Sequence, residues 1–291
     1  MIELIEKASV LIESLPYIQK FRNAVVVVKF GGSAMEDPEL IESVLRDVVL
    51  MECIGMHPVI VHGGGKAISA RLEKMGLPVK RTGGMRHTCD VTIKVVDDVL
   101  HNEVNSHLLE LLGKHQGKAQ RISGKDILKA TKMYVKDPDT GEDVDVGFVG
   151  DVCDVDVSHI KEILNKGEIP VITPLAKDAD GHVYNVNADI AAAKIAEALK
   201  ARKLVYLSDV PGLLECPPDE STLIHSIKTD DVEDYISRGI IAGGMLPKIL
   251  SAVEALKAGT RKVHMIDGRM KHSLLLEIFT DSGVGTEIIN A

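Results

Sequence analysis

The chain has 291 residues, 45% of them hydrophobic and 26% charged, which is typical of a soluble globular protein with room for one large or two moderate domains. Its net charge of −9 and its 3% of aromatic residues argue against nucleic-acid binding, because the chain offers neither a basic excess nor stacking platforms. The 4 cysteines are widely spaced and no apolar run approaches the ~20 residues of a membrane span, so we expect a cytoplasmic protein with no membrane partner.

Residues 1–22 are expected to form an N-terminal amphipathic arm. Apolar side chains recur there at helical spacing, and Pro16 should kink or interrupt the helix. The arm precedes the first core strand, so its apolar face must be covered either by its own domain or by another subunit. Periodicity alone leaves these two arrangements open.

A run of four valines dominates the segment 24–33, A-V-V-V-V-K-F-G-G-S, and predicts a strand buried on both faces in the middle of a parallel sheet. Lys29 and Gly31-Gly32 stand at its carboxyl end, where an α/β sheet opens its ligand crevice. Glycine lets the backbone approach a ligand closely, and a helix that starts nearby adds amide donors for a phosphate. A plain turn beside a solvated lysine would explain this stretch equally well.

The same pattern returns at residues 59–65. Val59-Ile60-Val61 predicts a second buried strand, and it runs directly into His62-Gly63-Gly64-Gly65. Two glycine-rich turns in one sheet favour a pair of adjacent anion-binding corners over a single structural turn.

The rest of the chain alternates helices and strands. A strong turn sequence at 137–141 lies between two strand-like runs, so we expect a β-hairpin at 132–151. Helices are expected at 38–51, 66–75, 91–100, 103–115, 158–166, 187–201, 246–258 and 273–279, and further strands at 169–172, 204–207 and 262–266. This order predicts an α/β fold, a three-layer sandwich with a central, mainly parallel twisted sheet. Two lobes, 23–177 and 178–291, should share that sheet.

The common nucleotide and metal motifs are absent from the sequence. It contains no G-x-x-x-x-G-K-[ST], no G-x-G-x-x-G between a strand and a helix, and no H-E-x-x-H. Polar residues stand instead at predicted helix starts. Asn187 could cap a helix with Asp189 in its first turn, which leaves Asn185 unexplained. Gly243-Gly244 open another helix, with Lys248 one turn in.

Taken together, these segments resemble the amino acid kinase superfamily. The matching segments are V-K-F-G-G at 28–32, V-H-G-G-G at 61–65, N-V-N-A-D at 185–189, L-S-D-V-P-G at 207–212 and G-G-M-L-P-K at 243–248. They cover nearly the whole chain in the family's order, and they are most similar to the branch that acts on N-acetyl-L-glutamate. The resemblance implies transfer of a phosphoryl group from ATP to the side-chain carboxylate of that substrate, in arginine biosynthesis. It also implies Mg²⁺ that is held by the ATP phosphates and not by the protein.

The resemblance further implies roles for individual residues. Lys29 and Lys248 would neutralise charge during the transfer, and Asp189 would hold both lysines in place. A carboxylate with a pKa of about 4.3 is already ionised at neutral pH, so the nucleophile needs no general base. The residues implied to bind the acetylated amino acid are Gly64, Gly65, Asn185 and Arg86, the last through the α-carboxylate. Those implied to bind the nucleotide are Gly31, Gly32, Asp209, Gly243 and Gly244.

Two positions depart from the family pattern, Cys89 in place of an aspartate and Ile127 in place of a glycine. They leave the exact acyl substrate open. A sister kinase of a carrier-bound aminoadipate or glutamate is therefore an alternative, as is a non-catalytic sensor of nucleotides or amino acids. Arg86 favours a small substrate with a free α-carboxylate, and the presence of both Lys29 and Lys248 argues against a sensor.

In this family, an N-terminal arm like residues 1–22 accompanies inhibition by arginine and the assembly of hexamers through exchange of the arm between dimers. The resemblance therefore implies a homo-oligomer, either a dimer or a hexamer, with L-arginine as an inhibitor. Tyr17, Glu277 and Gly283 are the candidates for the arginine site.

Overall fold

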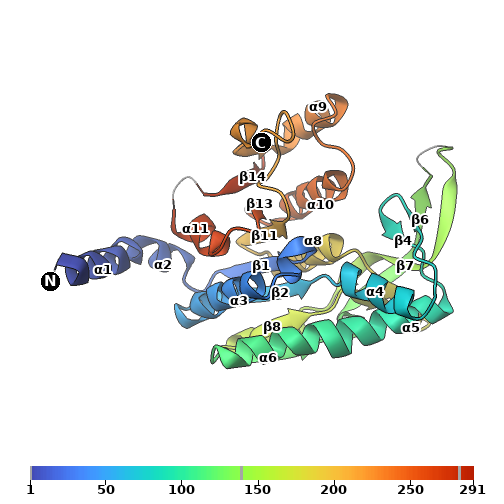
Figure 1. The fold of residues 1–291 in the computed structure, drawn as a ribbon, viewed down its shortest axis with the longest axis horizontal. Helices are drawn as coiled ribbons and strands as arrows, with labels where there is room; N and C mark the ends of the chain where they lie inside the picture. The colour runs from blue at the N-terminus through green and yellow to red at the C-terminus, as the bar shows by residue number, and fades with distance from the viewer. Residues whose placement is uncertain (1, 138–139, 281–282) are drawn as a thin grey trace.

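The computed structural model describes residues 2–137, 140–280 and 283–291 of the chain. Its centre is an eight-stranded sheet in the order β12-β14-β13-β11-β1-β2-β8-β5 (Figure 1). Neighbouring strands are parallel except β13 and β14, which confirms the expected mainly parallel sheet. Its strands are β1 Val25–Phe30, β2 His57–His62, β5 Ala119–Ile122, β8 Ile169–Ile172, β11 Lys203–Ser208, β12 Ser226–Lys228, β13 Val263–Asp267 and β14 Gly285–Ile289.

Helices cover both faces of this sheet and complete the three layers. Side chains alternate along β1, so Val27 packs with the helices of one face while Val26 and Val28 pack with those of the other. The first face carries α7 Ser158–Asn165, α8 Ala188–Leu199 and α10 Met245–Lys257, and the second carries α3 Pro38–Cys53, α6 Ser106–Lys114 and α11 Ser273–Phe279. Apart from α6, each of these helices lies where the sequence predicts one, with its ends shifted by at most two residues.

The helices expected at 91–100 and 103–115 are one continuous helix, so the predicted break between them is wrong. α5 (Asp90–Asp98) continues through a π-helical segment, η2 (Val99–Asn105), into α6. No glycine or proline occurs in the π-helical segment to stop the helix, and i→i+5 hydrogen bonds absorb the extra residue without ending it.

Four further strands form a small closed barrel, β10-β7-β6-β9, which the chain enters after the carboxyl ends of β5 and β8. β6 (Leu128–Lys136) and β7 (Asp143–Val155) pair as an antiparallel hairpin that includes the segment 132–151, where the sequence predicts one. Residues 138–139 lie outside the described part of the chain. The remaining elements are α4 Gly65–Lys74, α9 Val232–Ser237, the short strands β3 Arg81–Thr82, β4 Met85–Arg86, β9 Leu175–Lys177 and β10 Val183–Asn185, and 3₁₀ turns at Gly32–Met35, Gly124–Asp126, Glu220–Thr222 and Thr229–Asp231. The division into lobes at 177/178 stays a prediction.

The N-terminal helices α1 (Ile2–Glu13) and α2 (Leu15–Phe21) extend from one end of the body, far from the β6–β7 hairpin (Figure 1). Pro16 lies in the first turn of α2, where its missing N–H costs nothing. Val10, Leu11 and Ile12 are 64%, 71% and 69% exposed, so the apolar face of α1 is not covered by its own chain at these positions. Among the described residues, no helix is both long enough and apolar enough to span a membrane.

Candidate active site

Two lysines and one aspartate meet at the carboxyl end of the central sheet. Lys29 Nζ lies 2.9 Å from Asp189 Oδ1, and Lys248 Nζ contacts the other carboxylate oxygen, Oδ2. Residues far apart in the sequence thus share one carboxylate, and the structure brings the three predicted catalytic residues together. The side chains of Lys29 and Asp189 are each only 9% exposed, so their charges interact in a poorly solvated environment.

Three elements position these side chains. Lys29 is the penultimate residue of β1, while Asp189 and Lys248 lie in the first turns of α8 and α10. The Asn187 side chain accepts a hydrogen bond of 2.8 Å from the Asp189 N–H and caps α8, as the sequence predicts. The helix start therefore fixes the backbone from which the shared carboxylate projects.

The charges of the cluster stabilise one another. Burial alone would raise the pKa of Asp189, but Lys29 and Lys248 hold it below its usual value. Burial and the nearby charge of Lys29 lower the pKa of Lys248, against the attraction of Asp189. Two ammonium groups and one carboxylate leave a net positive charge at this point, which suits an anionic ligand.

A crevice of about 250 Å³ opens beside this cluster. Arg86, from the short β3–β4 hairpin, donates from Nη2 to the Gly65 carbonyl (2.8 Å) and to Ser69 Oγ (2.7 Å). Its Nη1 is buried without a hydrogen-bond partner in the described part of the chain, so a donor remains for a carboxylate. Burial, together with the charge of Arg81, lowers the pKa of Arg86 to about 10, which leaves it cationic at neutral pH. The crevice is lined by the predicted residues Lys29, Gly31, Gly32, Gly64, Gly65, Arg86, Asn185 and Asp189.

The other predicted nucleotide residues lie outside this crevice. Gly243 and Gly244 are exposed and directly precede α10. Asp209 follows β11 and faces Gly32, where a Cβ would lie 4.0 Å from the Asp209 carboxylate carbon. A side chain at Gly31 would displace the Lys29 ammonium group, because a Cβ there would lie 2.8 Å from Lys29 Nζ.

The two departures from the family pattern are not among the residues that line the crevice. Cys89 precedes α5, and its Sγ lies 3.3 Å from Thr92 Oγ1. Ile127 is buried in the core beside Leu128. Neither residue therefore offers a reason to change the expected substrate.

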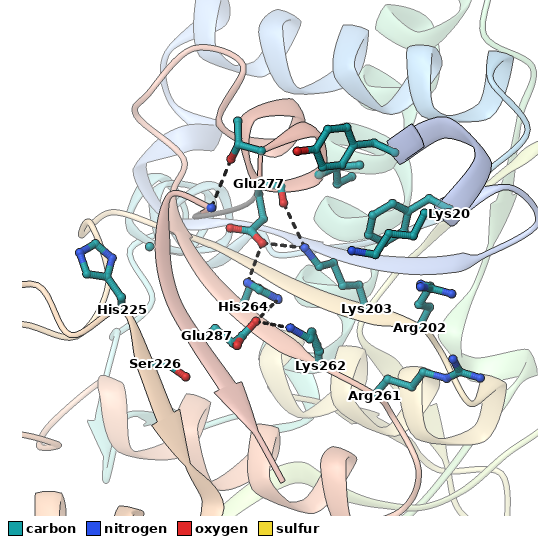
Figure 2. A pocket seen from close by; sticks show the side chains of 16 residues that line it. Lys20, Arg202, Lys203, His225, Ser226, Arg261, Lys262, His264, Glu277 and Glu287 are labelled. Atoms are coloured by element: carbon teal, nitrogen blue, oxygen red, sulfur yellow. Dashed lines mark hydrogen bonds and ion pairs between the residues drawn. The ribbon is translucent and has the colours of Figure 1, made fainter. Parts of the chain in front are cut away.

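A second cavity, of about 350 Å³, lies between the N-terminal arm and the edge of the sheet (Figure 2). Tyr17, Glu277 and Gly283 all line it, so the structure also brings these predicted residues together. The Glu277 carboxylate accepts from Lys203 Nζ at 2.6 Å and lies 2.7 Å from His264 Nδ1. Burial raises the pKa of Glu277, but His264 and Lys203 outweigh it and hold the pKa at about 2.

Sequence reasoning missed several residues that support these sites. Tyr206, in the middle of β11, is fully buried and its hydroxyl lies 2.9 Å from Ser251 Oγ, on the same helix as Lys248. Burial raises the pKa of Tyr206, so the phenol stays neutral. His264 lies within the strand expected at 262–266, and Lys203 lies just before the strand expected at 204–207; neither was expected to support a site. The signal at His264 was a basic residue inside an otherwise apolar strand.

Comparison with known proteins defines the class of this protein. Residues 24–267 match the model of the amino acid kinase family, and the chain belongs to that family. It is 48% identical to the acetylglutamate kinase of Aquifex aeolicus, covering 99% of both chains. It is 45% identical to the acetylglutamate kinase of Heliobacterium modesticaldum, covering 99% of this chain and 100% of the relative.

A solved structure has a similar fold. The N-acetylglutamate synthase of Neisseria gonorrhoeae, in complex with coenzyme A and N-acetylglutamate, superimposes with a TM-score of 0.84 at 25% identity. The alignment covers 98% of this chain and 63% of the synthase chain.

Proposed function

We propose that this protein transfers the γ-phosphoryl group of ATP to the side-chain carboxylate of N-acetyl-L-glutamate, giving N-acetyl-L-glutamyl 5-phosphate for arginine biosynthesis. Full-length relatives at 45% and 48% identity are acetylglutamate kinases, which supports this substrate. The observation that carries the mechanism is the shared carboxylate of Asp189, which holds the nitrogens of Lys29 and Lys248 at one point.

The chemistry follows from the charges of the reactants. The attacking carboxylate is ionised at neutral pH, so the chief obstacle is repulsion between two anions. Lys29 and Lys248 reduce that repulsion and stabilise the charge on the transferred group, while the glycine turns hold the two reactants in line. Arg86 is available to bind the α-carboxylate through Nη1, the nitrogen that has no other partner in the described part of the chain, which orients the acceptor.

The expected Mg²⁺ is compatible with this arrangement. Both carboxylate oxygens of Asp189 already contact lysines, so this residue is not free to ligate a metal. The ion would be held by the ATP phosphates, and Asp209 is an acidic side chain that follows β11 and faces Gly32. When bound, it neutralises phosphate charge. The protein's own part is to bring the acceptor and the two lysines to that phosphate.

A substrate panel tests the proposal. Release of ADP would be measured with N-acetyl-L-glutamate, glutamate, aspartate and carbamate, and the acyl phosphate trapped with hydroxylamine. We expect turnover with N-acetyl-L-glutamate at least 100-fold above the other acids, because only it offers both a free α-carboxylate and a blocked amine. Activity on a carrier-bound substrate alone, or ATP binding with no turnover of any acid, would overturn the proposal.

We also propose that the second cavity binds L-arginine as an inhibitor and that the arm mediates assembly. A buried carboxylate, Glu277, offers the guanidinium group a partner, and Tyr17 brings the arm to the same cavity. The exposed apolar residues of α1 are suited to pack against another copy of the chain.

Deletion of residues 1–22 tests both parts. The mass in solution and the inhibition by arginine would be measured beside the full chain. We expect a smaller oligomer and weaker inhibition. An unchanged oligomer that is still inhibited by arginine would contradict the proposal.

A further inference from the structure

His62 lies at the end of β2, directly before the glycine turn that lines the crevice. It is completely buried, and its two ring nitrogens have different partners. Nδ1 lies 2.9 Å from the carbonyl oxygen of Gly63, and Nε2 lies 3.0 Å from Nδ2 of Asn105. The ring therefore connects the glycine turn to the π-helical segment η2, to which Asn105 belongs.

The surrounding hydrogen bonds determine which nitrogen of His62 carries the proton. Arg121 Nε donates to Asn105 Oδ1 at 3.0 Å, so the oxygen of this amide faces Arg121. The Asn105 amide nitrogen then donates both to the Val171 carbonyl at 3.0 Å and to His62 Nε2. Since Nε2 accepts, Nδ1 carries the hydrogen and donates to the Gly63 carbonyl.

The same surroundings keep His62 uncharged. Burial, and to a lesser degree the charge of Arg121, lowers the pKa of His62 to about 4. The imidazole is therefore neutral throughout the physiological range, and its tautomer does not change with pH. Its hydrogen bond to the Gly63 carbonyl is a permanent feature of the turn.

That hydrogen bond has a geometric consequence for the next residue. In a planar trans peptide, the C=O of Gly63 and the N–H of Gly64 point in opposite directions. Holding the carbonyl toward the buried imidazole aims the Gly64 N–H away from it, toward the crevice that Gly64 lines. The opposite side of the turn is blocked, because a Cβ on Gly64 would lie 2.5 Å from Leu100 Cδ2.

The π-helical segment explains how one helix supplies both contacts. Leu100 and Asn105 are five residues apart in η2, and the wider i→i+5 turn brings such residues toward the same side. Leu100 packs on Gly64 while Asn105 bonds to His62, so this segment is the support behind the glycine turn.

We propose that His62, oriented by Asn105 and Arg121, is a positioning residue for phosphoryl transfer that directs the Gly64 N–H at the bound acetylated amino acid. This inference rests on the proposed function, in which Gly64 binds that substrate. The inference adds that Nδ1 of His62 carries the proton, and that Asn105 and Arg121 determine this.

Two substitutions of His62 by an amide residue test the two hydrogen bonds of the imidazole one at a time, because each variant keeps a different one. In His62→Asn the amide nitrogen replaces Nδ1 and keeps the donor to Gly63. In His62→Gln the amide group reaches the position of Nε2, which keeps a partner for Asn105 and loses the donor to Gly63. Glutamine is closer to histidine in volume. If His62 served packing alone, His62→Gln should therefore be the less damaging of the two substitutions.

We expect His62→Gln to raise the KM for N-acetyl-L-glutamate roughly 10- to 100-fold, because small misplacements of a binding group are costly. The KM for ATP should change less than threefold, and His62→Asn should recover most of the loss although its melting temperature is no higher. Equal losses in both variants, a reversed order, or parallel changes in both KM values would overturn the positioning role. The wild-type protein is assayed in parallel: its failure to phosphorylate N-acetyl-L-glutamate would refute the proposed function instead.

Discussion

The crevice and the second cavity are each built around a buried carboxylate with two basic neighbours, yet their charges differ. Asp189 lies between two lysines, so the cluster carries a net positive charge. Glu277 lies between Lys203 and His264, and burial lowers the pKa of His264, so that cluster is close to neutral. The first arrangement attracts an anion such as a phosphate, whereas the second offers a carboxylate inside a cavity that Lys20, Arg202, Arg261 and Lys262 also line.

The two clusters also differ in how firmly the carboxylate is held. Each oxygen of Asp189 contacts an ammonium group on a long side chain that can turn toward a ligand. Glu277 instead contacts Lys203, His264 and the backbone N–H of Val284, the last at 3.1 Å. A catalytic cluster needs partners that can respond to the substrate. The more fixed second cluster contributes to the packing of α11 against the sheet.

Lys248→Ala should produce the largest change. It removes one of the two charges that stabilise the transferred phosphoryl group, so we expect kcat to fall roughly 10²- to 10³-fold. ATP binding, measured by calorimetry, should weaken only modestly. Lys257→Ala, at the exposed end of the same helix, is the matched control and should stay within twofold of the wild type. If ATP binding collapsed while turnover survived, the catalytic role of Lys248 would be wrong.

Asp189→Asn tests whether the shared carboxylate matters as much as the lysines. Without its negative charge, Lys29 and Lys248 repel each other in a poorly solvated site. We expect kcat to fall about 100-fold, and the free energy of unfolding to fall by about 3 kcal/mol, as for other buried pairs that lose a partner. Urea titration and steady-state kinetics would measure the two effects. Unchanged turnover would show that the lysines do not need this anchor.

Arg86→Lys should act on the acceptor and not on the transfer step. Lysine keeps the charge but has a single nitrogen, which cannot bond to Gly65 and Ser69 and at the same time offer the separate donor that Nη1 provides. We expect about a tenfold increase in the KM for N-acetyl-L-glutamate, with little change in kcat or in the KM for ATP. A change in the ATP parameters alone would place Arg86 on the nucleotide side and remove its assignment to the acceptor.

Local sequence patterns indicated the glycine turns and the helix cap of the crevice, whereas Arg86 and Asn185 were indicated only by the family resemblance. Lys29 follows a run of valines that can only be a buried strand, and Asn187 precedes a long alanine-rich helix that needs a cap. Both signals lie within a few residues of the functional group. The family's spacing of segments then relates Lys248 to Lys29, and the structure brings both to Asp189.

Local sequence patterns could not predict contacts between segments that are distant in the chain. Lys203 and Glu277 are 74 residues apart, and nothing near either residue indicates their pairing. The two helices expected at 91–100 and 103–115 are joined by the π-helical segment, whose i→i+5 hydrogen bonds depart from the 3.6-residue period on which the prediction of a helix depends. The short strands β9 and β10 were not predicted either, because three residues are too few to show an alternating pattern.

Glu277→Gln should have the smallest effect on phosphoryl transfer, and its main effect should be on stability as a function of pH. The pKa of Glu277 is about 2 in the folded protein, below the ordinary 4.5, so between these values the unfolded chain binds the extra proton. Stability therefore rises with pH through this window, and the contribution is fully present above pH 4.5. It is lost as the pH falls toward 2.

At pH 7 the variant should be less stable by on the order of 2–3 kcal/mol in urea titrations, and the difference should shrink by pH 3. Glu39→Gln, which breaks the exposed pair with Lys271, is the control and should cost less than about 1 kcal/mol. If the variant lost the same free energy of unfolding at pH 3 and at pH 7, Glu277 would stabilise the fold by packing alone. Only Asp189 would then act through its charge, and the comparison of the two charged clusters would fail.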